Sequence, residues 1–303
     1  MIITKPARLR PGDRIGVIAP AGCVKRDALL RGVQAIQNHG FEVELSSRIL
    51  DSKGYLAGDE RNRAEDLINF FQRNDINAIF CARGGFGSAQ LLPYLIQSNF
   101  RPAPKIFAGY SDVTFLLNWI NNRFGMVTFH APMVAMELAR GVNGRTQEFF
   151  WGLLTGAKSE WQIDLGDVIR TGKAEGEMMG GCLSVLVTTL GTPYEIRTDG
   201  KLLFLEDIGE RPYRVERMLT HLKMAGKLDR LAGLVFGDFT NCEAEGSRSV
   251  LQIINEIFAQ APYPVVTGMP AGHGREHITL PFGSNMLLDG NSRSLSLVES
   301  PVV

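Results

Sequence analysis

The fold is decided first by the stretch KIFAGYSDVTFLLNWIN, which occupies residues 105–121. Its apolar start predicts a β-strand over Lys105–Ala108, and its apolar-periodic second half predicts a helix. The short turn GYSD joins the two elements, so we expect Ser111 on a sharp bend at the edge of a sheet, with its hydroxyl exposed. The start of the helix would supply free backbone N–H groups and the positive end of a dipole. Asp112 N–H is therefore the first candidate to bind an oxyanion.

The same alternation of short β-branched runs with longer amphipathic stretches surrounds this segment. It is typical of a parallel sheet covered by helices, in which ligands gather at the carboxyl ends of the strands. Residues 1–150 are therefore predicted to form a layered α/β domain with a parallel sheet. Its other strands are expected at Arg14–Ala19, Phe41–Leu45, Ala78–Cys81 and Met126–Phe129, with helices at Lys25–Asn38, at Glu60–Arg73 and from Ser88.

The alternation of strand-like and helix-like segments is weaker in the second half of the chain. Glycines recur between Gly141 and Gly172 without a long apolar strand, so residues 151–172 are predicted to be a crossover linker. Residues 173–303 are predicted to form a smaller, β-rich domain, because short β-like runs separated by glycine and proline follow Val265. The fold class is thus α/β with two domains. Before Val265 we expect a turn at Gly180-Gly181 that opens a helix, strands at Lys201–Leu205 and Leu231–Phe236, and helices at Tyr213–Met224 and Ser249–Gln260.

Composition excludes several kinds of partner. Lys and Arg total 32, as do Asp and Glu, so the chain lacks the positive field of a nucleic-acid or membrane binder, and a small molecule or peptide fits better. Apolar runs such as Ile15–Ala19 are far shorter than the roughly 20 residues that span a bilayer. Residues 1–11 are not followed by the apolar region of a secretory signal, so we expect a cytoplasmic protein. The four cysteines form no Cys-x-x-Cys pair, which argues against a zinc knuckle or a redox couple.

A glycine-rich turn, Arg83-Gly84-Gly85-Phe86-Gly87, follows the predicted strand Ala78–Cys81. Glycines let backbone N–H groups approach a ligand closely, so this turn could complete an oxyanion site with Asp112; a simple tight turn is the alternative. The Gly-x-Gly-x-x-Gly spacing of a dinucleotide site is absent, and no cofactor is predicted. Cys81 is expected to be a small buried hydrophobe, although a cysteine nucleophile could occupy such a place.

A reactive serine needs a base and a group that orients the base. His273 stands in a Gly-His-Gly loop whose glycines permit an exposed imidazole, and His130, at the end of a predicted strand, is a second candidate. Glu206 is the first polar residue after an apolar strand, where a carboxylate is held rigidly. The order Ser…Glu…His is known for triads. Each residue also has a plain alternative, with Ser111 as a helix cap and Glu206 as an ordinary turn acid.

The run His273-Gly274-Arg275-Glu276-His277 matches the zinc-peptidase spacing His-x-x-Glu-His. That motif binds zinc because a helix places both imidazoles on one face. Pro270, Gly272 and Gly274 make a helix unfavourable here, and a proline ends the strand-like run that follows. No metal is predicted.

Together these motifs resemble the LD-carboxypeptidases and the related microcin-immunity serine peptidases. The resemblance implies that Ser111, Glu206 and His273 form a catalytic triad, and that the amides of Gly85 and Asp112 form its oxyanion hole. The likeness spans nearly the whole chain and rests on the Gly-Tyr-Ser-Asp turn, the Arg-Gly-Gly-x-Gly turn, the segment Gly180 to Tyr194, Leu205 to Asp207, and Gly272 to Gly274.

The resemblance also implies an α/β first domain that carries the serine and a smaller β-rich domain that carries the acid and the base, with catalysis in the cleft between them and usually within a homodimer. The implied reaction removes the terminal D-alanine from the murein tetrapeptide in cytosolic peptidoglycan recycling. Arg83, Gly84 and Phe86 are expected to contact the substrate. Cys182 stands where the family often has asparagine. Two alternatives stay open: an immunity enzyme that cleaves a peptidyl-nucleotide, and a non-catalytic two-lobed binding protein.

Overall fold

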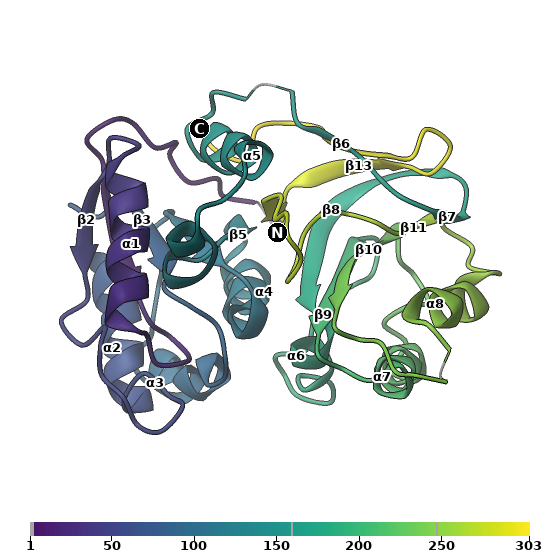
Figure 1. The fold of residues 1–303 in the computed structure, drawn as a ribbon, viewed down its shortest axis with the longest axis horizontal. Helices are drawn as coiled ribbons and strands as arrows, with labels where there is room; N and C mark the ends of the chain where they lie inside the picture. Colours follow the sequence, from purple (N-terminus) through teal and green to yellow (C-terminus); the bar gives the residue numbers. More distant parts are fainter. Residues whose placement is uncertain (1–2, 159, 247) are drawn as a thin grey trace. The chain divides into compact units, whose positions relative to one another are not determined.

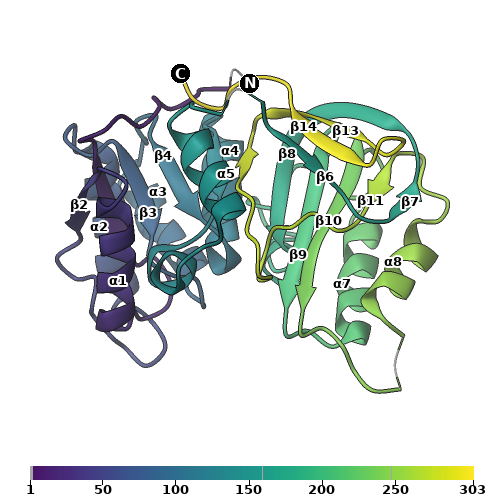
Figure 2. The same ribbon diagram turned by 45° about the horizontal axis from the view of Figure 1, so that its top comes forward.

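The computed structural model describes residues 3–158, 160–246 and 248–303, and the chain forms two compact units (Figures 1 and 2). The first unit comprises Met1–Ser159 and Pro301–Val303, and the second comprises Glu160–Ser300. Backbone hydrogen bonds of 3.0 and 2.8 Å join Val303 to Pro6 and Arg8, which attaches the end of the chain to the first unit. Among the described helices, none is both long enough and apolar enough to cross a membrane.

The first unit is built on parallel strands that, in its described residues, follow the order β2-β1-β3-β4-β5. Strands β3 and β4 bury every residue, as is typical of the middle of a parallel sheet. Because β1 lies between β2 and β3, the winding of the chain reverses there, and the loops after β1 and β3 meet at the point where such sheets bind ligands. A hydrogen bond from Gly22 N–H to the Gly84 carbonyl (2.9 Å) joins these loops. The strands are β1 (Arg14–Ile18), β2 (Glu42–Leu45), β3 (Ala78–Cys81), β4 (Ile106–Gly109) and β5 (Thr128–His130).

Helices connect these strands. The first of them, α1, lies along the sheet in Figure 1 and buries Leu29, Gly32 and Ile36, a spacing that places all three on one face. This face packs on the π-helical turn η3, where a side chain at Gly32 would overlap the Val134 carbonyl. The helical segments are α1 (Arg26–Gln37), α2 (Glu60–Gln72), η1 (Ser88–Leu91), α3 (Leu92–Gln97), η2 (Ser111–Val113), α4 (Thr114–Phe124), η3 (Val134–Leu138) and α5 (Gly144–Leu154).

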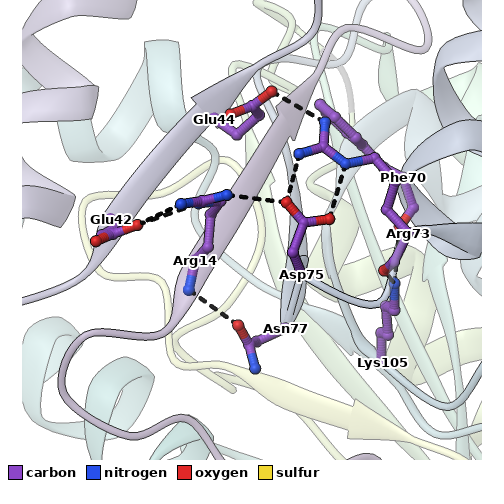
Figure 3. Close-up of polar contacts among 8 residues, drawn as sticks. All are labelled: Arg14, Glu42, Glu44, Phe70, Arg73, Asp75, Asn77 and Lys105. Carbon is purple, nitrogen blue, oxygen red and sulfur yellow. Dashed lines mark hydrogen bonds and ion pairs between the residues drawn. The ribbon is translucent and has the colours of Figure 1, made fainter.

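A charged network lies at the amino ends of these strands (Figure 3). Arg14, the first residue of β1, pairs with Glu42 of β2 (2.8 Å) and with Asp75 (2.9 Å). Asp75 also pairs with Arg73 (2.6 Å), whose guanidinium holds the pKa of the Asp75 carboxyl well below its usual range. Because the network is exposed, its contribution to stability is small. It occupies the edge of the sheet opposite the strand ends that carry Gly84 and Ser111.

The second unit contains a mixed sheet in the order β6-β14-β13-β8-β9-β10-β11-β7. The central strands β8 to β11 run parallel, and antiparallel strands flank them on both sides. The unit is therefore α/β in its centre and β-rich at its edges. The strands of this sheet are β6 (Gln162–Asp164), β7 (Val168–Arg170), β8 (Lys173–Cys182), β9 (Leu202–Ile208), β10 (Gly233–Thr240), β11 (Val265–Val266), β13 (Asn285–Asp289) and β14 (Ser294–Leu297). The short strand β12 (Leu280–Phe282) is not part of this sheet.

The described residues of this unit form the helices α6 (Leu183–Val187), α7 (Pro212–Met224) and α8 (Val250–Phe258). Helices α7 and α8 lie side by side (Figures 1 and 2). Helix α7 buries Val215, Leu219 and Leu222, whose spacing forms one apolar stripe, in a core shared with strands β9 and β10. Helix α8 begins with a capping box, in which Gln252 N–H donates to Ser249 Oγ (3.2 Å) and Ser249 N–H donates to Gln252 Oε1 (2.8 Å).

The structure differs from the sequence prediction in the second unit. The predicted turn at Gly180-Gly181 is wrong, because strand β8 runs through both glycines to Cys182. A side chain at Gly180 would overlap the Phe204 carbonyl of β9, so glycine marks a close approach of two strands here and not a turn. Within the stretch 151–172, predicted as a crossover linker, the described residues include the end of α5 and the short edge strands β6 and β7; residue 159 lies outside the described residues.

Candidate active site

Ser111 occupies a sharp turn between strand β4 and helix α4. The strand ends at Gly109, and Tyr110 is extended (φ −156°). Ser111 adopts φ +61° and is the first residue of the 3₁₀ turn Ser111–Val113. A left-handed backbone is uncommon for a residue other than glycine, and it is typical of constrained functional positions. The turn thus has the strand-to-helix geometry of a nucleophile elbow.

Gly84 packs directly against this serine. A Cβ atom at position 84 would lie 2.7 Å from Ser111 Cβ and 2.8 Å from Ser111 Oγ. Real Cβ atoms do not approach other atoms so closely, so only a residue without a side chain fits beside the hydroxyl in this arrangement. Gly84 therefore shapes the immediate surroundings of Ser111.

Two backbone N–H groups near Ser111 have the properties of oxyanion donors. In the described part of the chain, no acceptor is found for the N–H groups of Gly85 or Asp112. Ser88 joins the loops that carry them, because its N–H donates to Asp112 Oδ2 (2.8 Å) and its hydroxyl donates to the Asp112 carbonyl (2.7 Å). Burial raises the pKa of the Asp112 carboxyl, while its hydrogen bonds from Ser88 lower it.

A buried arginine that the sequence analysis missed fixes the same loops. Arg63 Nη1 donates to the carbonyls of Pro20 (2.6 Å) and Gly87 (2.8 Å), and Nη2 donates to Gln90 Oε1 (2.8 Å). One guanidinium thus connects the loop after β1 with the loop after β3. The sequence signal was present, since Arg63 falls next to Ala64 on the buried face of helix α2.

Arg83 and Phe86 flank the two glycines of this loop. Arg83 Nη1 donates to the Cys23 carbonyl (3.0 Å), which holds part of its guanidinium against the loop after β1. The Phe86 ring is 52% exposed and meets the exposed Tyr55 ring edge to face, with 6.0 Å between their centroids. The loop therefore presents a cation and an aromatic pair beside Gly85.

The alternative nucleophile, Cys81, and the alternative base, His130, are both buried in this unit. Cys81 is fully buried, and its burial raises the pKa of the thiol far above its usual range, as expected for a structural residue. His130 is also fully buried, and its ring packs on Tyr110 with 5.5 Å between the centroids.

In the second unit, the structure brings Glu206 and His273 together. Glu206 Oε2 and His273 Nδ1 are 2.7 Å apart, and Glu206 is fully buried in strand β9. This strand continues to Ile208, so Glu206 lies within a strand and not after its end. Gly272 permits the contact, because it adopts φ +119° and a Cβ there would lie 2.7 Å from Glu206 Oε2. A carboxylate on Nδ1 leaves Nε2 as the nitrogen for proton transfer.

The neighbouring carboxylate, Asp207, has a different role. Its Oδ2 accepts the N–H of Ser184 (2.7 Å) and its Oδ1 accepts the N–H of Ile208 (2.8 Å), which fixes the beginning of helix α6 to strand β9. Cys182 Sγ lies 3.6 Å from the same carboxylate. Burial raises the pKa of Asp207. Of the adjacent pair, Glu206 thus reaches the histidine, and Asp207 holds the backbone.

The segment that follows His273 is irregular. Residues 273–279 form neither a helix nor a strand, and His277 is buried. The spacing His-x-x-Glu-His therefore lacks the helical geometry that would place both imidazoles on one face.

Each unit thus contributes one group of candidate residues. The first holds Gly84, Gly85, Ser111 and Asp112 together at the strand ends of its sheet, and the second holds Glu206 and His273.

Comparison with known proteins covers both units. The N-terminal domain of the LD-carboxypeptidases matches residues 15–131, and the C-terminal domain of the same family matches residues 175–288. A protein of Bacillus subtilis named a probable murein peptide carboxypeptidase is 38% identical, over 98% of this chain and 95% of its own length. The microcin C7 self-immunity protein of Escherichia coli is 27% identical, over 97% and 95%. The crystal structure of a muramoyltetrapeptide carboxypeptidase from Oxalobacter formigenes superimposes with a TM-score of 0.82 at 28% identity, over 94% of this chain and 97% of that one.

Proposed function

Since this chain belongs to the LD-carboxypeptidase family, we propose that it is a serine carboxypeptidase that releases the terminal D-alanine from murein tetrapeptides. The observation that carries the proposal is the part-buried hydrogen bond of 2.7 Å between Glu206 and His273, combined with a serine on a strained elbow. A carboxylate paired with Nδ1 is what a histidine needs to act as a general base for a serine. The names of the relatives support murein peptides as the substrate class.

In the proposed mechanism, Ser111 Oγ attacks the carbonyl carbon of the last peptide bond. His273 Nε2 takes the proton of the hydroxyl and then delivers it to the leaving amine of D-alanine, while Glu206 stabilises the imidazolium. The N–H groups of Gly85 and Asp112 stabilise the oxyanion of the tetrahedral intermediate. Water activated by His273 then hydrolyses the acyl-enzyme and restores the serine.

Recognition of the substrate end follows from the loop Arg83 to Gly87. Its backbone N–H groups and the Arg83 guanidinium are the donors we assign to the terminal carboxylate. A charge-assisted hydrogen bond is worth about 1.5–3 kcal/mol, so one such bond supports discrimination of about 10- to 100-fold. Gly84 and Phe86 complete this contact surface. We further propose that the enzyme works in cytosolic peptidoglycan recycling and as a homodimer.

Amidation of the substrate terminus is expected to lower kcat/KM by about 10- to 100-fold, because the amide cannot form the charge-assisted bond. A terminal L-alanine is expected to be at least as poor, since inversion exchanges methyl and carboxylate and moves the carbonyl away from Ser111. The measurement compares one tetrapeptide ending in D-alanine, L-alanine or D-alanine amide, with the products identified by mass spectrometry. Equal turnover of all three would replace the carboxypeptidase assignment with that of a general hydrolase.

Cleavage of a peptidyl-nucleotide is the second candidate, and the exposed pair Tyr55 and Phe86 is the observation that favours it. Aromatic faces beside the loop of Gly85 offer a place for a nucleobase to stack. Incubation with an aminoacyl sulfamoyl nucleoside, in competition with the tetrapeptide, separates the two candidates. Preferred turnover of the nucleoside conjugate would assign the chain to the immunity enzymes.

A further inference from the structure

Strand β10 contains an irregularity next to the histidine loop. Its pairing with β9 shifts register between Phe236 and Phe239, so Gly237 and Asp238 form a bulge. Bulges redirect side chains and occur preferentially beside active sites. Gly237 allows the loop to come close, since a side chain there would overlap the Ala271 carbonyl.

Asp238 contacts the loop on both sides of His273. Its backbone N–H donates to the Ala271 carbonyl (3.1 Å), and its carboxylate packs against the backbone of Gly274. The carboxylate lies so near that a side chain at Gly274 would overlap Asp238 Oδ2. One residue of the bulge therefore fixes the backbone two positions before the histidine and one position after it, while Glu206 fixes the ring.

The charges that face Asp238 come from strand β9 and from the loop itself. Burial, Glu206 and Glu276 raise the pKa of Asp238, the backbone of Gly274 and His273 lower it, and the net pKa is about 6. The ionised carboxylate is thus held in place against its own desolvation. Groups kept in an unfavourable charge state are concentrated at functional sites.

We propose that Asp238 is a positioning residue for His273, holding the histidine loop at Ala271 and Gly274 so that the imidazole stays on Glu206 and its positive charge is stabilised during turnover. The inference rests on the proposed function, since it assigns Asp238 a part in that reaction. A residue kept only for packing would have no need of a charge here, because asparagine has nearly the same shape and could pack against Gly274 in the same way.

The test compares Asp238→Asn and Asp238→Ala with the wild type from pH 5 to pH 8 on the D-alanine tetrapeptide. At pH 8 we expect Asp238→Asn to lower kcat by about 10-fold and Asp238→Ala by about 10- to 100-fold, with KM changed less than about two-fold. At pH 5 the wild-type carboxyl is itself mostly neutral, so the ratio of wild type to Asp238→Asn is expected to shrink to about two-fold. Asp289→Asn is the matched control, because the Asp289 carboxylate also contacts the backbone, accepting the N–H groups of Asn291 and Ser292 in a turn at the end of β13.

Stability provides a second readout with the opposite sign. Because the folded state raises the pKa of Asp238 above that of the unfolded chain, ionised Asp238 destabilises the fold above about pH 6, and this cost disappears as the pH falls. At pH 8, Asp238→Asn should therefore have an unfolding temperature equal to or above that of the wild type, although its kcat is lower. A kcat ratio that stays constant from pH 5 to pH 8, or a kcat equal to that of the wild type at pH 8, would overturn the inference. An inactive wild type, or activity that persists in Ser111→Ala, would instead overturn the proposed function.

Discussion

Replacement of Ser111 by alanine is expected to lower kcat by at least about 10⁴-fold while the fold stays intact. The hydroxyl is the attacking group, and alanine keeps the Cβ atom that packs on Gly84. Initial rates on the D-alanine tetrapeptide, with thermal unfolding to verify the fold, measure the effect. Ser52→Ala is the control, because Ser52 is an exposed serine of the same unit whose hydroxyl bonds only weakly to Gly54 O (3.4 Å).

Glu206→Gln and His273→Ala are expected to cost a similar factor each, and to add little when combined with Ser111→Ala, because triad members act as a unit. A Ser111→Ala variant that kept a tenth of the wild-type rate would exclude this serine as the nucleophile. If Ser111 also failed to react with an activated phosphonate, the non-catalytic binding protein would become the better interpretation.

Gly84→Ala should strongly impair turnover, because its added methyl group reaches the catalytic atoms directly. Its Cβ would lie 2.7 Å from Ser111 Cβ, 2.8 Å from Oγ and 3.3 Å from Asp112 N, so both the nucleophile and an oxyanion donor must move. A displacement of this size at reacting atoms costs about 10²-fold, and loss of an oxyanion donor costs about 10²- to 10³-fold. We expect kcat to fall by about 10²- to 10³-fold.

The control for Gly84→Ala is Gly144→Ala, in the first turn of helix α5. No atom lies within 4 Å of a Cβ at Gly144, so this variant is expected to keep the wild-type rate. Crystal structures or chemical labelling of Ser111 in both variants would show whether the hydroxyl is displaced. Wild-type turnover by Gly84→Ala would mean that the loop after β3 moves freely away from the elbow, and it would remove Gly85 from the oxyanion hole.

The elements of the first unit could be predicted closely because their signals are local. The strand Ala78–Cys81 is observed with the predicted bounds, and the helix from Glu60 ends one residue before its predicted end, at Gln72. Short apolar runs and amphipathic periodicity report directly on a buried parallel strand and on a helix with one buried face. The bend at Ser111 could be predicted for the same reason, since strand, turn and helix are adjacent in the chain.

What could not be predicted depends on contacts between distant residues. The place of Arg63 on the apolar face of its helix indicates burial, but only the fold places its guanidinium between the carbonyls of Pro20 and Gly87. Asp238 becomes significant only because a bulge turns it toward a loop more than 30 residues later, and a bulge has no composition of its own. The prediction of a turn at Gly180 is wrong because glycine occurs both where the chain bends and where another strand approaches closely.

The left-handed backbone of Ser111 lowers the stability of the fold, although its side chain is needed for catalysis. Glycine adopts φ +61° without the strain that a side chain brings. The greater flexibility of glycine in the unfolded chain offsets part of this gain. The free energy of unfolding of Ser111→Gly should therefore equal that of the wild type or exceed it by up to about 1 kcal/mol. The same change removes the nucleophile. Directed evolution that selected only for thermal stability would therefore favour more stable variants without catalytic activity. A selection for thermal stability in this protein needs a turnover assay in every round.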